Sequence, residues 1–140
     1  MLNIVIDHAP AKADNDTVME SLIAFNEQVM GEPRDKDFSV FLKDNAGSIF
    51  GGVQAHFDRE SVYIEVLWVA EGFKRQGYGR KLLNATEQEA VKNGCIYSIV
   101  DTLDFQAEEF YLKNGYSCMG KIKKYWGIHS RIFLRKCLNS

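Results

Sequence analysis

One short segment of the sequence combines glycines with basic side chains where an apolar stretch gives way to a helical pattern. It follows Val69 closely and reads Lys74-Arg75-Gln76-Gly77-Tyr78-Gly79-Arg80-Lys81. Glycines let the backbone approach a ligand closely, and the N–H groups at a helix N-terminus carry partial positive charge. The segment is therefore suited to bind an anion such as a phosphate group. The alternative is an ordinary glycine-containing turn followed by solvated basic side chains.

The two common nucleotide-binding patterns do not match this segment. The dinucleotide pattern G-x-G-x-x-G/A requires a small residue where Leu82 stands. The pattern G-x-x-x-x-G-K-[ST] of nucleotide P-loops occurs nowhere in the chain. We therefore expect a phosphate site of another kind.

The periods of the apolar residues predict the elements that position this segment. Strands are predicted at 3–7, 38–42, 48–57, 62–69, 95–100, 116–125 and 128–137, and helices at 17–30, 77–93 and 104–114. Hairpin-like strand pairs and a strand–helix–strand crossover occur together, which is typical of an α+β fold with a mixed sheet. The length of 140 residues predicts a single domain over 1–140.

Local signals set the predicted ends of several elements. Thr17 and Glu20 have the spacing of a capping box at the start of the first helix, and Gly31 with Pro33 ends it. Asp104 is the expected N-cap of the last helix. Gly51-Gly52 predicts a bulge or a close backbone approach in the second of the three consecutive strands.

Composition narrows the class of protein. The net charge is 17 − 19 = −2, which argues against a nucleic-acid binder. The sequence has no apolar run of about 20 residues and no secretory signal pattern, so we expect a cytoplasmic protein with no membrane partner. Cys95, Cys118 and Cys137 fit neither a disulfide framework nor a zinc site, and no metal is expected.

Two ordered motifs give the chain from Tyr63 to Gly115 a resemblance to the GNAT family of acetyl-coenzyme A-dependent N-acetyltransferases. That family's signature is R/Q-x-x-G-x-G/A, and residues 74–79 match it with Lys74 in the first position. Lysine keeps the charge there but lacks the forked donors of arginine. The second motif, F-Y-x-K-x-G-F/Y, is matched by Phe110-Tyr111-Leu112-Lys113-Asn114-Gly115-Tyr116.

The resemblance implies a GNAT-like mixed central β-sheet with helices on both faces. An N-terminal antiparallel meander, a splayed parallel central pair and a C-terminal hairpin would make up the sheet. Acetyl-coenzyme A, as cosubstrate, would place its pyrophosphate on the amides of 75–80 and its pantetheine arm between 62–69 and 95–100. The residues assigned to the cofactor are Leu67, Trp68, Val69, Lys74, Arg75, Gln76, Gly77, Tyr78, Gly79, Arg80 and Gln106. The Trp68 side chain itself is expected in the core.

The implied chemistry needs two proton transfers. An alkylammonium group has a pKa near ~10.4, so a base must take a proton before the amine attacks. Glu65 is the candidate base, because it interrupts an apolar strand two residues before Leu67, on the same side of the pleat. A solvent-facing carboxylate is the alternative, and Asp101 is a competitor. Tyr111 matches the family's acid for the departing thiolate; a core aromatic is its alternative.

The acceptor would be a primary amine of a small molecule or peptide. In the family, the acceptor pocket is shaped by the segments that correspond to 13–38 and 121–129. The acidic residues in 13–38 would suit a cationic amine, and a homodimer through the closing strands is possible in such a fold. The alternatives are a non-catalytic acyl-coenzyme A sensor or scaffold, and a nucleic-acid protein using basic residues between Lys121 and Lys136. For Lys121, Lys123 and Lys124 we favour a solvated strand edge.

Overall fold

The computed structural model describes residues 1–32 and 36–138 of the chain. The chain divides into two compact units, Met1–Pro33 and Arg34–Ser140. Each is described by itself.

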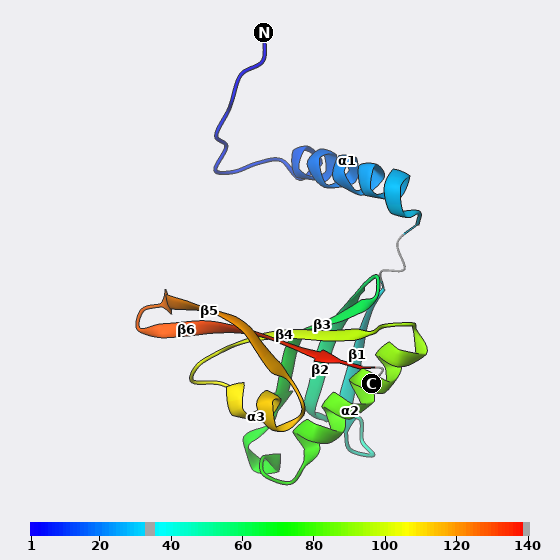
Figure 1. The fold of residues 1–140 in the computed structure, drawn as a ribbon, viewed down its shortest axis with the longest axis vertical. Helices are drawn as coiled ribbons and strands as arrows, with labels where there is room; N and C mark the ends of the chain where they lie inside the picture. The colour runs from blue at the N-terminus through cyan, green and yellow to red at the C-terminus, as the bar shows by residue number, and fades with distance from the viewer. Residues whose placement is uncertain (33–35, 139–140) are drawn as a thin grey trace. The chain divides into compact units, whose positions relative to one another are not determined.

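The second unit is built on a mixed sheet (Figure 1). Over residues 36–138 its strand order is β1-β2-β3-β4-β6-β5. The strands are β1 (Asp37–Lys43), β2 (Ile49–Asp58), β3 (Ser61–Val69), β4 (Tyr97–Leu103), β5 (Ser117–Trp126) and β6 (His129–Cys137). Only β3 and β4 pair in parallel, and β6 lies between β4 and β5. The expected meander, parallel central pair and C-terminal hairpin are confirmed.

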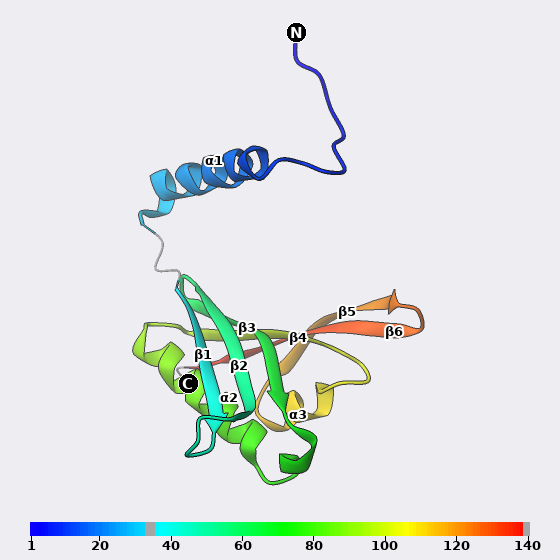
Figure 2. The same cartoon turned by 180° about the vertical axis from the view of Figure 1, so that it is seen from behind.

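Two helices of this unit lie on one face of the sheet, as Figures 1 and 2 show from opposite sides. They are α2 (Tyr78–Lys92) and α3 (Glu108–Lys113), and a 3-10 turn, η1 (Glu71–Phe73), precedes α2. Leu82, Leu83 and Ala90 of α2 pack into a core with apolar side chains from β2, β3, β4 and β6. Alternation along the strands aims one row of side chains at this core. The strand residues of this core are Val53, Ala55, Phe57, Val62, Ile64, Val100, Ile132 and Leu134.

Gly51 lies where β2 approaches β3 closely. A Cβ atom on Gly51 would lie 3.0 Å from the Trp68 carbonyl oxygen and 3.3 Å from Leu82 Cδ1. The predicted close backbone approach at Gly51-Gly52 is therefore confirmed.

The first unit contains α1 (Lys12–Met30), which begins earlier than predicted. Thr17 lies inside the helix, and its hydroxyl donates to the Ala13 carbonyl at 2.9 Å, so the capping-box prediction is wrong. Helix continues back to Lys12, where the ammonium group pairs with Asp16 at 2.7 Å across one turn. The predicted end is confirmed at Gly31, which has a φ of +76°. Pro33 lies outside the described residues.

The predicted strand at 3–7 is also wrong, because these residues have no regular secondary structure. Alternating apolar residues form a strand only when a neighbouring strand supplies backbone hydrogen bonds. Among the described residues of this unit, no strand is present that could pair with them.

The helix predicted at 104–114 is shorter than expected. Residues 104–107 form a turn, and α3 begins at Glu108. The Asp104 carboxylate accepts from the Ser130 amide and from His129 Nδ1, each at 2.8 Å, instead of capping the helix. These two hydrogen bonds, with the Ser130 amide as the larger cause, hold the pKa of Asp104 below its usual value. The long-range bonds to β6 thus replace the local cap.

Shortening Ile132 tests the position of the core. Ile132 of β6 is fully buried, whereas Ile122 of β5 is 47% exposed. Ile132→Ala is expected to lower the free energy of unfolding by about 2–5 kcal/mol, because it removes buried methyl groups and leaves a cavity. Ile122→Ala, the matched control, should cost about 1 kcal/mol or less. Equal losses in urea denaturation would contradict the assigned core face.

Candidate active site

A cleft of about 1070 Å³ opens where β3 and β4 separate. The two strands pair only from Ser61↔Tyr97 to Ile64↔Val100. Beyond this point β3 continues to Val69 beside β2, while β4 continues to Leu103 beside β6. The cleft is lined by these diverging ends together with the loop before α2, the first turn of α2, and α3.

A β-bulge in β3 lies at the point of divergence. Ala55 pairs with Ile64 and Gln54 with Val66, so Glu65 is an extra residue between two paired ones. Glu65 and Val66 are consecutive exposed residues, and the alternation of β3 breaks there. The expectation that Glu65 shares a side of the pleat with Leu67 is therefore wrong.

The bulge places the Glu65 carboxylate on the sheet face opposite the core. There its Oε1 atom lies 2.7 Å from Nδ1 of His56 on β2. The sequence analysis missed His56 as a partner. The pairing of His56 with Tyr63 was predictable, because the turn at 58–61 sets these two residues opposite each other. The extra residue in the bulge has no comparable sequence signal.

The glycine-containing loop is held by contacts from both sides. The Lys74 ammonium group lies 3.0 Å from Glu71, and Lys74 lowers the pKa of that carboxyl. The Gln76 amide donates to the Gly72 carbonyl at 3.2 Å. The Phe73 ring packs against Phe50 of β2, with ring centroids 4.7 Å apart. The loop is thus fixed to β2 and η1.

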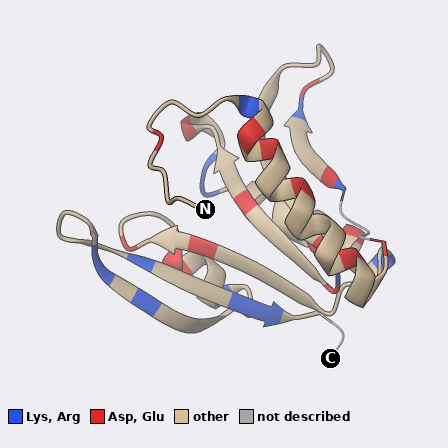
Figure 3. Ribbon diagram, turned by 90° about the horizontal axis from the view of Figure 1, so that it is seen from above, with Lys and Arg blue, Asp and Glu red and all other residues tan. Residues whose placement is uncertain are grey.

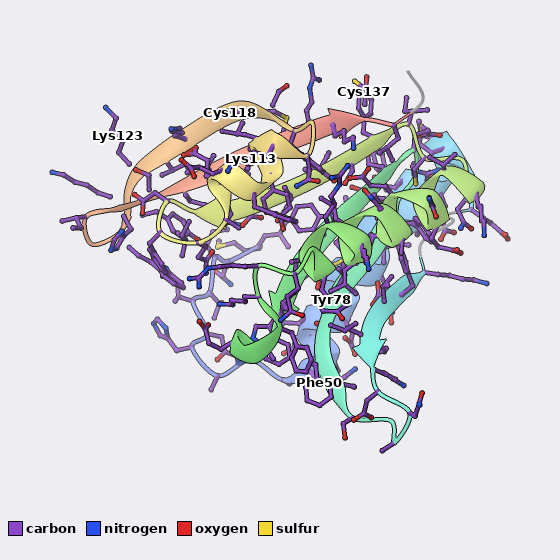
Figure 4. The ribbon with its side chains drawn as sticks, turned by 90° about the horizontal axis from the view of Figure 1, so that it is seen from below. Phe50, Tyr78, Lys113, Cys118, Lys123 and Cys137 are labelled. Atoms are coloured by element: carbon purple, nitrogen blue, oxygen red, sulfur yellow. The ribbon has the colours of Figure 1, made fainter. Side chains whose placement is uncertain are left out.

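The backbone of the loop turns abruptly into α2. Arg75 and Gly77 both have left-handed conformations, with φ of +62° and +83°. Gly77 is the N-cap, and the first intrahelical hydrogen bond joins the Lys81 amide to its carbonyl at 3.1 Å. The preceding amides have no acceptor four residues back in the helix. Figure 4 labels Tyr78 at this start of α2, and Phe50 on β2.

Gly79 allows the first turn of α2 to pack closely on α3. A Cβ atom there would lie 3.3 Å from Cε1 of Phe110. This close packing brings the two sequence motifs together, since Tyr111 follows Phe110 and also lines the cleft.

The Tyr111 side chain is both a core residue and a wall of the cleft. It is 3% exposed, and its ring packs edge-on against Phe110 and Tyr116. Burial raises the pKa of Tyr111 above its ordinary value, and the charge of Asp101 raises it further. Its phenol is therefore protonated at neutral pH.

Asp101 of β4 also lines the cleft, but both of its oxygens are engaged. The Tyr63 hydroxyl donates to Oδ2, and Arg131 Nε donates to Oδ1 at 3.0 Å. The Asp101 carboxylate in turn raises the pKa of Arg131, chiefly through this hydrogen bond. A carboxylate held in this way is a weaker candidate base than Glu65. The sequence analysis missed Tyr63 and Arg131, which the sheet brings from two other strands.

The sequence from residue 6 to residue 116 matches the family described as Acetyltransferase (GNAT) family. The chain belongs to the GNAT family.

Relatives of this GNAT protein are themselves named acetyltransferases. It is 31% identical over 122 residues to acetyltransferase Atu2258 of Agrobacterium fabrum strain C58, covering 86% of this chain and 88% of that protein. It is 30% identical over 125 residues to blasticidin-S acetyltransferase of Streptomyces morookaense, covering 87% and 92%. An acyl-transfer enzyme is therefore supported.

Solved structures show the same fold. A 1.9 Å crystal structure of an acetyltransferase from Bacillus cereus ATCC 14579 is similar with a TM-score of 0.87 and 29% identity, over 96% of this chain and 98% of that one. An aminoglycoside 6′-N-acetyltransferase complexed with coenzyme A shares the fold with a TM-score of 0.68 and 19% identity, over 81% and 78%.

The structure brings nearly all the predicted cofactor residues of the GNAT motifs to one cleft. Those that line it are Leu67, Trp68, Val69, Lys74, Arg75, Gly77, Tyr78, Gly79, Arg80 and Gln106. Gln76 is not among the lining residues and instead binds the loop carbonyl described above. Gln106 lies in the turn before α3, where its side-chain oxygen accepts from the Leu103 amide at 3.0 Å.

The expected core position of the Trp68 side chain is wrong. Trp68 pairs with Gly52, and its side chain is 52% exposed. After the bulge, the alternation of β3 aims Leu67 and Val69 toward the core and Trp68 away from it.

Over 1–32 and 36–138, no group of three or more His, Cys, Asp or Glu side chains could hold a metal ion. Over the same residues, no helix has the length and apolar character needed to cross a membrane.

The protonation of Tyr111 can be tested directly. An ordinary tyrosine titrates near ~10, but burial and the Asp101 charge should keep Tyr111 protonated beyond that pH. Wild type and Tyr111→Phe should therefore show the same number of phenolate groups by ultraviolet absorbance up to about pH 11. In denaturant the wild type should show one more phenolate group than Tyr111→Phe. An extra phenol with an ordinary midpoint in the folded wild type would contradict the assignment.

Proposed function

We propose that this protein transfers the acetyl group of acetyl-coenzyme A to a primary amine of a small molecule or peptide. The observation that carries the proposal is the cleft itself. One wall holds a basic, glycine-containing helix start, and both Tyr111 and Glu65 are among the residues that line the same cleft.

The loop before α2 suits the diphosphate of coenzyme A. The N-terminal amides of α2 are donors without intrahelical acceptors, and a helix N-terminus favours an anion. Lys74, Arg75 and Arg80 line the cleft beside these amides. Lys74 is paired with Glu71, so Arg75 and Arg80 are the stronger candidates for phosphate contacts.

The free edge of β3 suits the pantetheine arm. The Ala70 amide donates to Phe50 of β2 at 2.7 Å. Because backbone polar groups alternate in direction along a strand, Leu67 and Val69 direct theirs away from β2, toward the cleft. Because β4 does not pair with β3 beyond Ile64, the amide groups of an extended pantetheine arm can hydrogen-bond to this edge as an added strand would. The coenzyme A complex of a protein with the same fold supports this use of the cleft.

In the proposed reaction, one side chain accepts a proton from the acceptor and another donates a proton to the leaving group. Glu65 accepts the proton that turns the acceptor ammonium into a free amine. The amine nitrogen then bonds to the acetyl carbon as the carbon–sulfur bond breaks. Tyr111 gives its phenolic proton to the departing sulfur and recovers one from the newly acylated nitrogen. A general acid or base at such positions commonly contributes ~10²–10⁴-fold.

A cationic small molecule is the acceptor class we favour. Blasticidin-S acetyltransferase is among the relatives at 30% identity, and its name specifies a small-molecule acceptor. Acidic residues recur along α1 (Figure 3), including Asp14, Asp16, Glu20 and Glu27. An acidic helix of this kind attracts cationic molecules. Residues 33–35 of the acidic segment predicted from the sequence lie outside the described residues.

Replacing Tyr111 tests the catalytic part of the proposal. Tyr111→Phe is expected to lower kcat by roughly tenfold or more, because the thiolate loses its proton donor. Coenzyme A affinity, measured by calorimetry, should not change. Tyr116→Phe is the matched control, since Tyr116 is equally buried but its hydroxyl bonds to Ser98 and Glu87 instead of lining the cleft. Thiol release at an unchanged rate in Tyr111→Phe would remove Tyr111 from the acid role.

Replacing Gly77 tests the phosphate site. Gly77→Val should weaken coenzyme A binding by about tenfold or more, because a β-branched residue disfavours the φ of +83° that sets the loop amides. Gly47 in the β1–β2 turn has a φ of +86°, and a Cβ atom would meet nothing within 4 Å at either glycine. Gly47→Val therefore carries similar backbone strain and should leave affinity unchanged. Equal affinities for both variants would show that the loop does not bind the diphosphate.

A further inference from the structure

We infer that His56 is a positioning residue for Glu65 and holds its carboxylate ready to act as the base. The inference rests on the proposed function, in which Glu65 is the base. His56 lies on β2, outside both sequence motifs, and its Nδ1 atom is 2.7 Å from Glu65 Oε1.

The bulge is the reason that Glu65 needs a positioning residue. As the extra residue of β3, Glu65 has no cross-strand partner of its own on β2. Its side chain is 51% exposed, and a glutamate in that setting samples several rotamers. The hydrogen bond to His56 fixes one carboxylate oxygen and leaves Oε2 for the acceptor amine.

The imidazole ring of His56 is itself held by its neighbours. It pairs across the ladder with Tyr63, and the two ring centroids lie 5.4 Å apart. The Tyr63 hydroxyl is bonded to Asp101, which Arg131 also holds. Asp37 of β1 is the cross-strand partner of His56 on its other side. The Tyr63 ring therefore orients the imidazole, on a strand that β1 and β3 flank.

The geometry also gives the proton a route out of the cleft. Glu65 takes one proton from the acceptor ammonium at Oε2. The Nδ1–H group of His56 goes on donating to Oε1, so the imidazole keeps its own proton throughout. The Glu65 side chain is 51% exposed, which allows it to pass the proton it has taken to water. One proton enters and one leaves, and Glu65 returns to its starting form.

A double-mutant cycle tests whether His56 acts through Glu65. His56→Ala should lower kcat about tenfold, which is a part of the ~10²–10⁴-fold that a base contributes, with the KM for acetyl-coenzyme A unchanged. In a Glu65→Gln background the same change should alter kcat by less than about twofold, because coupled residues are not additive. Added imidazole should restore part of the kcat of His56→Ala, but none in the double variant. A full further loss in the Glu65→Gln background would overturn the inference.

His8→Ala is the control for the loss of an imidazole. His8 is exposed, does not line the cleft and lies outside the segments assigned to the acceptor. Its kcat should stay within about twofold of wild type, as expected for substitutions outside a coupled pair. A tenfold loss in this variant, or none in His56→Ala, would contradict a specific role for His56.

A measurement without turnover separates this inference from the proposed function. Absence of acetyl transfer by the wild type, across a panel of amines, would refute the proposed function. The His56–Glu65 pair would still be visible in the ¹⁵N NMR signals of the His56 ring, whose Nδ1 shift should change in Glu65→Gln. An unchanged Nδ1 signal would overturn the pairing whatever the activity.

Discussion

The separation of β3 from β4 is the constraint on which the site depends. A parallel pair that continued to the ends of both strands would close the sheet and leave no cleft. Pairing stops at Ile64↔Val100, and the next residue, Glu65, is the extra residue of the bulge toward β2. The bulge increases the local twist of β3, while β4 stays in register with β6. The cleft therefore begins at the inserted residue, Glu65, whose exposed carboxylate lies at the same position in the sheet.

Buried polar contacts hold the helices that complete the cleft. Ser98 of β4 donates to the Tyr116 hydroxyl at 2.7 Å, and that hydroxyl donates to Glu87 of α2 at 2.9 Å. Lys136 of β6 pairs with the other oxygen of Glu87 at 2.7 Å. Such a network adds little stability by itself, but leaving any member unpaired would be costly. It therefore fixes α2 against the sheet, and the Tyr116 ring in turn supports Tyr111.

The parts of the fold that were predictable from the sequence depend on local patterns. The helix predicted at 77–93 agrees with α2 to within one residue at each end, because its glycine and its apolar period act within a few residues. The strands of the sheet were found within a few residues of their ends, since each has a clear apolar pattern. The glycines and basic residues of the loop by themselves indicate an anion site, whereas the expected role of Tyr111 comes only from the resemblance to the GNAT family.

Several of the wrong predictions involve partners distant in the sequence. Asp104 has the character of a helix cap, but β6 supplies its hydrogen bonds. The alternation of β3 predicted one side for Glu65, and a register shift toward β2 moved it to the other. The pairing of Glu65 with His56 follows from that shift. Local propensity cannot report such contacts, because they exist only after the strands have paired.

A crystal structure of the protein with acetyl-coenzyme A tests the central claim most directly. The account predicts the diphosphate on the backbone amides between Arg75 and Arg80. It also predicts an extended pantetheine arm hydrogen-bonded to Leu67 and Val69, with the thioester beside Tyr111. A cofactor bound elsewhere, or a cleft filled by side chains while the cofactor is present in solution, would contradict it.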